Sequence, residues 1–452
     1  MPSRRTFALA ALVVTIGAVY GSLVPFNFRP IDVGEAVARF RRIPLLTIGP
    51  SGRADWVSNI LLFVPVAFLW MGALTLDIKR LWRRAVWAIG LIVALVALSI
   101  ALEFTQMWFP PRTVSQNDII AESLGAAAGA ILWLAFGQTT TDWLRTVAAA
   151  RRPRDRFVKL LELYAVGVLI YSVLPLDLTI SSGDFMDKLR AGRLVLVPFS
   201  DVRLGAEGIY GLARDVVVFV PMGMLLGIWE TRAAVRVRPI WLTAFLGLVA
   251  AALIEGLQVF VLSRYASATD VVFGTVGAAG GGALMVWLYA GRYGPDSVDR
   301  AGPVHRRALA WGAATCFAAV VIIVVFCAPF EVAGSSEDWR RRYEGIWAAP
   351  FARLYFSSEY NAVSDVLRKL LLFGALGAFG AKTAAAMRLP GRITGLLSAV
   401  VVLAGAGLSL GIEIAQVVLP PHVPDITDVI LGGLGAAAGV AVVSFVTKRA
   451  PI

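Results

Sequence analysis

Apolar residues in this chain are gathered into runs long enough to cross a lipid bilayer. A membrane-spanning helix needs about 20 mostly apolar residues, and twelve runs of roughly this length follow one another between polar segments. They cover residues 7–24, 56–74, 84–108, 118–136, 157–174, 212–229, 239–262, 270–290, 307–328, 364–381, 393–419 and 428–446. The pattern predicts an all-α integral membrane protein with about twelve transmembrane helices. The first run lacks a clear cleavage site, so we interpret it as a retained helix rather than a signal peptide.

Basic residues lie mainly on one side of the predicted helices. The loops after the even-numbered helices and both termini are basic. By contrast, the short loops after helices 3 and 7 hold one basic residue each, Arg112 and Arg264, and the short loop after helix 11 holds no Lys or Arg. Cytoplasmic loops are the ones enriched in Lys and Arg, so we expect both termini in the cytoplasm. The longer first loop of each group of four helices also carries arginines, which runs against this rule. Its segments 184–199 and 339–356 fit either amphipathic helices in the membrane interface or packing over the bundle.

Composition narrows the class of protein further. The chain has 452 residues, of which 58% are hydrophobic and 16% charged, and a mean hydropathy of +0.74. Soluble domains contain about 25% charged residues, so a soluble globular protein is excluded, as is a disordered one. The net charge of +12 is scattered between apolar runs, which argues against nucleic-acid binding. Two cysteines exclude a disulfide framework and a Cys-based zinc or iron–sulfur site, and two histidines are too few for a His-rich metal centre. We expect neither a metal nor a cofactor.

One set of residues recurs three times. A Glu and a Gln three residues later lie in the third helix of each group of four, at 103/106, 255/258 and 413/416. Each Glu is followed at +9 by Arg112, Arg264 or His422, and at +15 by Asp118, Asp270 or Asp428. Each Asp precedes a G-x-x-x-G pair, at Gly125/Gly129, Gly277/Gly281 and Gly435/Gly439, which is typical of close helix packing. Each first helix ends in Pro and a bulky residue: Pro25-Phe26, Pro175-Leu176 and Pro329-Phe330.

These recurrences predict three repeats of four helices, with units at 1–150, 151–300 and 301–452. An even number of helices gives every unit the same orientation, so the repeats are parallel. A pseudo-threefold bundle is the simplest arrangement, and three units in a row is the alternative.

The composite motif resembles the VanZ-like family. The first unit matches best, with D-x-x-x-N-x-L-L-F-x-P from Asp55 and Asn59 to Phe63 and Pro65, followed by Glu103, Gln106, Arg112 and Asp118. The second unit has Gly211 and Asp215 at the first two positions, and the third has Asp365 and Lys369, with Ala375 in place of the proline. The resemblance implies a cell-envelope membrane protein. The namesake of the family is associated with resistance to the glycopeptide teicoplanin.

The repeated polar residues are the candidate site. Glu and Gln at i and i+3 share a helix face, and the expected topology places them near the outer leaflet with the Asp that opens the next helix. Ionisable residues inside a membrane are functional candidates. The expected ligand-binding residues are Asp55, Asn59, Glu103, Gln106, Arg112, Asp118 and Glu122, then Asp215, Glu255, Gln258, Arg264 and Asp270, and then Asp365, Glu413, Gln416, His422 and Asp428. A structural role is the alternative: Glu tied to Arg112 or to a helix N-terminus, Asp as an N-cap, and Gln in interhelical hydrogen bonds. Glu122 has no acidic counterpart in the other units and marks the first unit as the best candidate, with local pairing of a buried Glu as the alternative.

The leading hypothesis is a non-enzymatic protein of a bacterial-type inner membrane. Its outward-facing polar pockets would bind an envelope lipid or a lipid-linked cell-wall precursor, and so alter antibiotic access. A transporter or flippase is the second hypothesis, although the inner halves of the helices hold almost no ionisable groups. The third is an intramembrane acid–base enzyme using Glu103 or Glu122, for which no nucleophile accompanies the acids.

Overall fold

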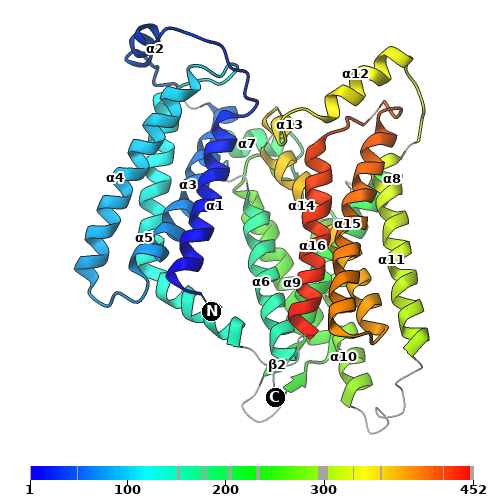
Figure 1. The fold of residues 1–452 in the computed structure, drawn as a ribbon. Helices are drawn as coiled ribbons and strands as arrows, with labels where there is room; N and C mark the ends of the chain where they lie inside the picture. Colours follow the sequence, from blue (N-terminus) through cyan, green and yellow to red (C-terminus); the bar gives the residue numbers. More distant parts are fainter. Residues whose placement is uncertain are drawn as a thin grey trace. The chain divides into compact units, whose positions relative to one another are not determined.

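The computed structural model describes residues 2–47, 49–149, 153–174, 177, 179, 181–200, 202, 206–230, 235–293, 304–328, 330–356, 359–420 and 422–447. The repeated Pro175-Leu176 pair and Pro329 lie outside the described residues. Twelve long helices contain most of the described residues, and each overlaps one of the predicted apolar runs. Figure 1 shows their order along the chain.

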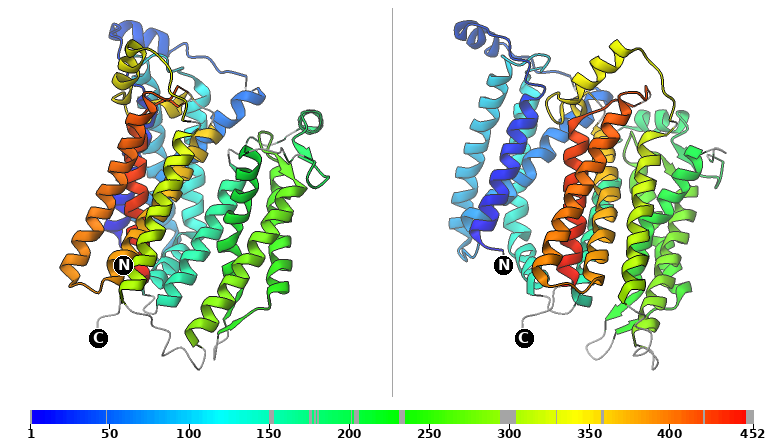
Figure 2. Two further views of the ribbon diagram at one scale, coloured as in Figure 1. Left: turned by 90° about the vertical axis from the view of Figure 1, so that its right-hand side faces the viewer. Right: turned by 45° about the vertical axis from the view of Figure 1, so that its right-hand side comes forward.

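Each repeat contains four of these long helices. The first repeat has α1 (Arg4–Leu23), α3 (Pro50–Thr75), α4 (Leu81–Gln106) and α5 (Gln116–Ala149). The second has α6 (Pro153–Val173), α8 (Ala206–Leu226), α9 (Ile240–Val259) and α10 (Ala268–Tyr293). The third has α11 (Val304–Cys327), α14 (Glu359–Ala386), α15 (Gly391–Gln416) and α16 (Ile426–Thr447). The four helices of the third repeat lie side by side in both views of Figure 2.

The predicted all-α membrane fold is confirmed. Within the described residues, nine helices are long and apolar enough to cross a membrane. The other three long helices, α6, α8 and α14, are outside this set, so twelve spans remain a prediction.

Short elements connect the first helix of each repeat to the second. They are α2 (Val33–Phe40), α7 (Ser182–Arg190), α12 (Ser336–Ile346) and α13 (Ala352–Tyr355). Helices α7 and α12 overlap the segments 184–199 and 339–356, for which amphipathic interface helices and packing over the bundle were the two alternatives. Each begins at a serine in a capping box. Two small sheets complete the fold: β1 (Leu194–Val195) pairs in parallel with β4 (Ala266–Ser267), and β2 (Ile228–Glu230) pairs antiparallel with β3 (Val235–Val237).

Glycines bring the fourth helix of each repeat against the second. A Cβ added at Gly125 would lie 2.2 Å from the Ile60 carbonyl oxygen, and one at Gly129 would lie 2.3 Å from that of Val64. The same contact recurs between Gly277 and Val216 at 2.2 Å, and between Gly435 and Leu370 at 2.9 Å. The G-x-x-x-G pairs therefore pack helices closely, as predicted, because only a residue without a Cβ permits this approach of two backbones.

The chain divides into two compact units. One consists of Met1–Ile48, Ser58–Ala149 and Gly302–Ile452, and the other of Gly49–Val57 and Ala150–Ala301. In the first repeat the core surrounds Trp133, which is 1% exposed, packs edge-on to Phe7 and donates a hydrogen bond of 2.7 Å to Thr75 Oγ1. The third repeat has its own apolar core around Phe326 and Phe373.

Candidate functional site

The repeated glutamate joins the end of the third helix to the start of the fourth. In every repeat its Oε2 accepts a hydrogen bond from the backbone N–H of the residue twelve positions later. The oxygen–nitrogen distances are 3.1 Å for Glu103 and Ser115, 2.9 Å for Glu255 and Ser267, and 2.7 Å for Glu413 and Asp425. Because the first N–H groups of a helix have no partner within it, the carboxyl satisfies a donor that burial would otherwise leave unpaired. The repeated glutamate therefore binds a helix N-terminus, which is one of the two structural roles that the sequence left open.

The repeated Gln and the basic residue after it bind the opposite kind of helix end. Gln106 Nε2 donates to the Ser22 carbonyl at 3.0 Å, and Gln416 Nε2 donates to that of Phe326 at 2.8 Å. Both acceptors lie at the C-terminal end of the first helix of their repeat, where the carbonyls lack partners within the helix. Gln258 is half-buried at the end of α9, and its backbone carbonyl accepts a hydrogen bond from Lys188.

Arg112, Arg264 and His422 serve the same helix ends. Arg112 Nε donates to the Val24 carbonyl at 2.7 Å and Arg264 Nε to that of Leu174 at 2.9 Å, and each guanidinium also reaches a second carbonyl one turn earlier. His422 Nε2 lies 2.8 Å from the Ala328 carbonyl oxygen. Cations at a helix C-terminus also meet the negative end of its dipole.

The aspartate at the start of the fourth helix is not the N-cap. In the first repeat Ser115 Oγ accepts from the Asp118 N–H at 3.3 Å and donates to Asp118 Oδ2 at 2.8 Å, so Ser115 caps the helix and Asp118 lies in its first turn. Sequence reasoning missed the caps Ser115, Ser267 and Asp425. A signal was present, because S-x-x-D at 115/118 and 267/270 and D-x-x-D at 425/428 resemble capping sequences.

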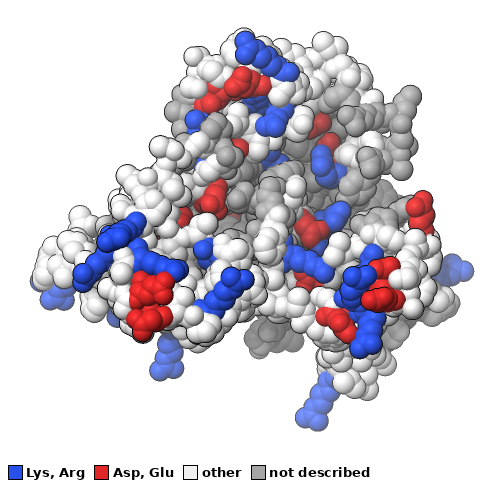
Figure 3. Space-filling model, turned by 90° about the horizontal axis from the view of Figure 1, so that it is seen from above, with Lys and Arg blue, Asp and Glu red and all other residues white. Residues whose placement is uncertain are grey.

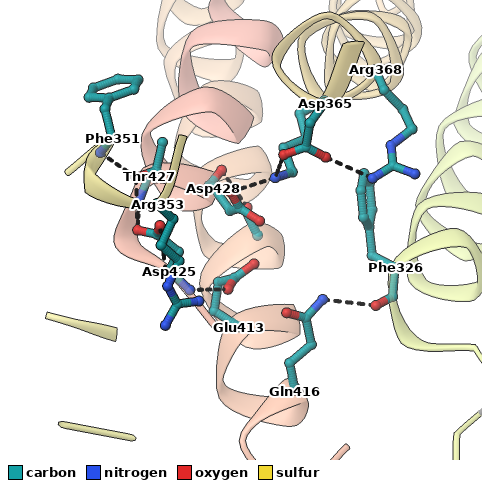
Figure 4. Close-up of polar contacts among 12 residues, drawn as sticks. Phe326, Phe351, Arg353, Asp365, Arg368, Glu413, Gln416, Asp425, Thr427 and Asp428 are labelled. Atoms are coloured by element: carbon teal, nitrogen blue, oxygen red, sulfur yellow. Dashed lines mark hydrogen bonds and ion pairs between the residues drawn. The ribbon is translucent and has the colours of Figure 1, made fainter. Parts of the chain in front are cut away.

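The partner of that aspartate differs between repeats. Asp118 Oδ1 accepts from Asn59 Nδ2 at 2.7 Å, whereas Asp428 Oδ1 lies 2.6 Å from Lys369 Nζ. Lys369 also binds Asp365. Figure 4 shows Asp365 and Asp428 above Glu413 in the third repeat.

The second repeat has an acid at the corresponding position. Asp215 binds the neighbouring Arg214 at 2.8 Å, and both Asp215 and Asp270 act electrostatically on Glu255. Asp55 is exposed near the start of α3, one turn before Asn59.

Glu122 is buried on α5, one turn after Asp118, and is 3% exposed. Its carboxyl lies beside Ser99 of α4, which is fully buried. Neither Glu122 Oε2 nor Ser99 Oγ has a hydrogen-bond partner of acceptable geometry among the described residues. Buried polar groups are rarely left unpaired, and Ser99 gave no signal in the sequence analysis.

Two buried or half-buried cations of the connecting helices were also missed. Lys188 of α7 donates to the carbonyls of Gln258, Val259 and Val261 at 2.5–3.1 Å. Burial lowers the pKa of Lys188 to about 8. In the third repeat Arg342 of α12 binds the equivalent end of α15 through the carbonyls of Gln416, Leu419 and His422.

These contacts explain why the first loops carry arginines against the expected charge rule. Some of their cations bind helix ends, and others pair with acids on the same short helix, as Arg39 does with Glu35 and Arg340 with Glu344. Figure 3 views the end of the helices that carries α2 and α12, and Lys and Arg are intermixed there with Asp and Glu. The helical spacing within these segments was a signal for short helices, but it did not indicate the groups that they bind.

A cavity of about 540 Å³ lies beside α12. It is lined by Ala333, Gly334, Asp338, Arg341, Arg342 and Pro420. Arg341 Nη2 lies 2.7 Å from Asp338 Oδ1, while Arg342 is anchored by the carbonyls at the end of α15. Hydrogen bonds from Ser335 and the Arg341 charge hold the pKa of Asp338 below its usual value, so this carboxyl is ionised.

No group of three His, Cys, Asp or Glu side chains among the described residues is arranged to hold a metal ion. The predicted site residues thus form three separate sets, one in each repeat. Their hydrogen bonds to backbone groups join the ends of neighbouring helices.

Comparison with known proteins identifies the repeat unit. The VanZ/LLP1 family model matches residues 5–137, 161–289 and 314–447. Neither the curated proteins nor the solved structures yield a match to the chain. The three matches cover most of the sequence and coincide with the four-helix repeats found in the fold. The chain is therefore a multi-pass membrane protein of the VanZ/LLP1 family, built from three tandem VanZ-like units.

Proposed function

We propose that this protein lies in a bacterial cytoplasmic membrane, with both termini in the cytoplasm. On the outer side it binds the phosphoryl group of an envelope lipid or of a lipid-linked cell-wall precursor. The observation that carries the proposal is the arginine-lined cavity beside α12.

The position of the cavity supports the outer side. The basic loops after the even-numbered helices favour a cytoplasmic location for that end of the bundle. Helix α12 follows the first helix of its repeat, so it lies at the opposite end. The arginines at this end are largely occupied with helix carbonyls and neighbouring acids, which reconciles their number with the charge rule.

The lining of the cavity suits an anionic oxygen ligand. A guanidinium presents a planar fork of N–H donors that matches two phosphate oxygens. Arg342 is held by three backbone carbonyls, so little side-chain entropy remains to be lost when a ligand binds. Asp338 neutralises one of the two cations, which leaves a net charge of +1 in the lining for a single phosphoryl group.

A matched pair of arginines tests the proposal. Arg341 lines the cavity, whereas Arg340 is exposed on the same helix, pairs with Glu344 and is not part of the lining. We expect native mass spectrometry of the full chain to detect binding of undecaprenyl phosphate but not of undecaprenol. Arg341→Ala should weaken this binding about tenfold, and Arg340→Ala should leave it unchanged. Equal weakening by both substitutions, or equal binding of the alcohol, would overturn the proposal.

A cellular experiment tests the link to antibiotics. We propose that occupation of the cavity changes the access of glycopeptides to their envelope target. Cells that produce the wild-type protein should differ in teicoplanin sensitivity from cells with Arg341→Ala at equal membrane levels. An unchanged sensitivity would refute this link without bearing on lipid binding.

A further inference from the structure

The three repeats share the glycine contacts between the second and fourth helices but differ at two positions beside them. The glycine contacts set the register, because Gly125, Gly277 and Gly435 meet the carbonyls of Ile60, Val216 and Leu370. In this register the residue preceding each carbonyl is Asn59, Asp215 or Lys369. Three residues before each glycine stands Glu122, Gly274 or Gly432. At the first position the first repeat has the neutral amide of Asn59 where the third has the ammonium of Lys369. At the second position the first repeat has the carboxyl of Glu122 where the third has Gly432, which has no side chain.

In the third repeat the chain supplies its own cation to the acids. Lys369 is 7% exposed, and its Nζ binds both Asp428 and Asp365. Its charge also acts on Glu413, which lies close to Asp428 (Figure 4). Gly432 leaves no space for a further acid, because an added Cβ would lie 2.7 Å from that of Ser409. The hydroxyl of Ser409 is bonded to the Asp428 carbonyl at 2.9 Å.

In the first repeat the same place holds more acid and, among the residues that the structure describes, no ammonium group. Asn59 offers Asp118 an uncharged amide at 2.7 Å. Glu122 takes the place of Gly432, beside Ser99 in the place of Ser409. The charges of Asp118, Glu122 and Arg112 all act on Glu103, so the three carboxyls lie close together. The Arg112 guanidinium is itself bound to the carbonyls that end α1. Among the described ion pairs, none involves Glu103 or Glu122.

The unpartnered atoms point to a ligand. Glu122 and Ser99 are buried side by side, and neither Glu122 Oε2 nor Ser99 Oγ has a hydrogen-bond partner of acceptable geometry among the described residues, whereas Ser409 Oγ is bonded. A buried carboxylate is strongly unfavourable unless a cation or donors accompany it, and without them the carboxyl takes up a proton. The described acids are not arranged for a metal ion, and Lys369 shows that an ammonium fits this scaffold.

We propose that the first repeat binds the primary ammonium group of a ligand between Glu122, Ser99 and Asp118, where Lys369 places its own ammonium in the third repeat. Three N–H donors of such a group match two carboxylates and a hydroxyl oxygen. The ligand is an aminophospholipid with this head group or a soluble phosphorylated amine. The site lies in a different repeat from the arginine-lined cavity, so it stands or falls independently of that cavity.

Two arms of one experiment distinguish the two sources. The purified full chain is placed in phosphatidylcholine nanodiscs, whose quaternary ammonium has no N–H donors. Phosphatidylethanolamine is added in one arm and soluble phosphoethanolamine in the other, with phosphocholine as the matched control. We expect binding of the primary amine at least about tenfold tighter than that of its trimethylated counterpart. The arm in which it occurs identifies the source.

Two substitutions locate the binding. Asn59→Lys introduces the ammonium of the third repeat and should abolish amine binding, while Gln138→Lys, on the exposed surface of α5, should not. Glu122→Gln preserves the shape of the side chain and should weaken binding about tenfold. Glu413→Gln makes the same change at a buried carboxyl of the third repeat and should leave binding unchanged. If Asn59→Lys fails to fold, Glu122→Gln decides. The inference is wrong if neither amine binds, or if Glu122→Gln binds as tightly as the wild type.

Discussion

The glycine contacts give the most direct test of how each repeat is held together. Replacing Gly129 by Ala would place a Cβ 2.3 Å from the Val64 carbonyl oxygen and 2.8 Å from the Ala67 Cβ. Favourable contacts between carbon atoms begin at about 3.5 Å, so α5 and α3 must separate by about 1 Å at their closest point. Overpacking of this kind costs about 1–3 kcal/mol.

The control for this substitution is Gly90→Ala in α4. Nothing lies within 4 Å of the position that its Cβ would occupy, and Gly90 is exposed. Both substitutions gain about 1 kcal/mol from the higher helix propensity of Ala. The difference between the two variants therefore isolates the packing cost, and we expect Gly129→Ala to be less stable than Gly90→Ala by about 1–3 kcal/mol.

Reversible unfolding in mixed detergent–SDS micelles measures this difference as a free energy of unfolding. Gly281→Ala should behave like Gly129→Ala, because its Cβ would lie 2.0 Å from the Val220 carbonyl oxygen. Equal stability of Gly129→Ala and Gly90→Ala would refute the inference that this glycine packs α5 against α3.

Two further predictions concern the groups that bind helix ends. Glu413→Ala should lower the free energy of unfolding by about 1–3 kcal/mol, because it leaves the buried Asp425 N–H without its acceptor. Glu413→Gln keeps an acceptor oxygen and should cost less, so equal losses in SDS unfolding would show that the charge is what matters. Lys188 has a pKa of about 8 in the folded protein against 10.5 when exposed. Since the unfolded chain then binds more protons between these two values, stability should rise with pH across that window. The difference in stability between the wild type and Lys188→Met, measured by thermal unfolding at several pH values, should rise with pH. A difference that stays constant or falls would contradict the prediction.

Much of the fold was predictable because its causes are periodic along the chain. The length and spacing of the apolar runs place each of the twelve long helices, since a helix in lipid must satisfy its own backbone and expose apolar side chains. The glycine pairs predict close packing because small residues at i and i+4 share one helix face. The repeat itself follows from Glu, Gln and Asp returning at constant spacing.

The candidate site was predictable in its residues but less so in their roles. The sequence alone identified the recurring Glu, Gln, Arg and Asp, and singled out Glu122 by its lack of a counterpart. It left open whether Glu103 meets Arg112 or a helix N-terminus, because both lie within reach along the chain. The structure shows the N-terminal bond to Ser115, and it shows Arg112 on the carbonyls that end α1.

What only the tertiary structure decided is which buried polar groups meet. Every helix ends in unpaired carbonyls, so no sequence pattern says that Lys188 binds those of α9 or that Arg342 binds those of α15. The contrast between Glu122 with Ser99 and Gly432 with Ser409 likewise depends on two helices lying side by side. The sequence by itself determined the class of protein, its helices and its threefold repetition. The role of each recurring side chain was decided by hydrogen bonding between helices. This bonding depends on distances in space that the spacing of residues along the chain does not set.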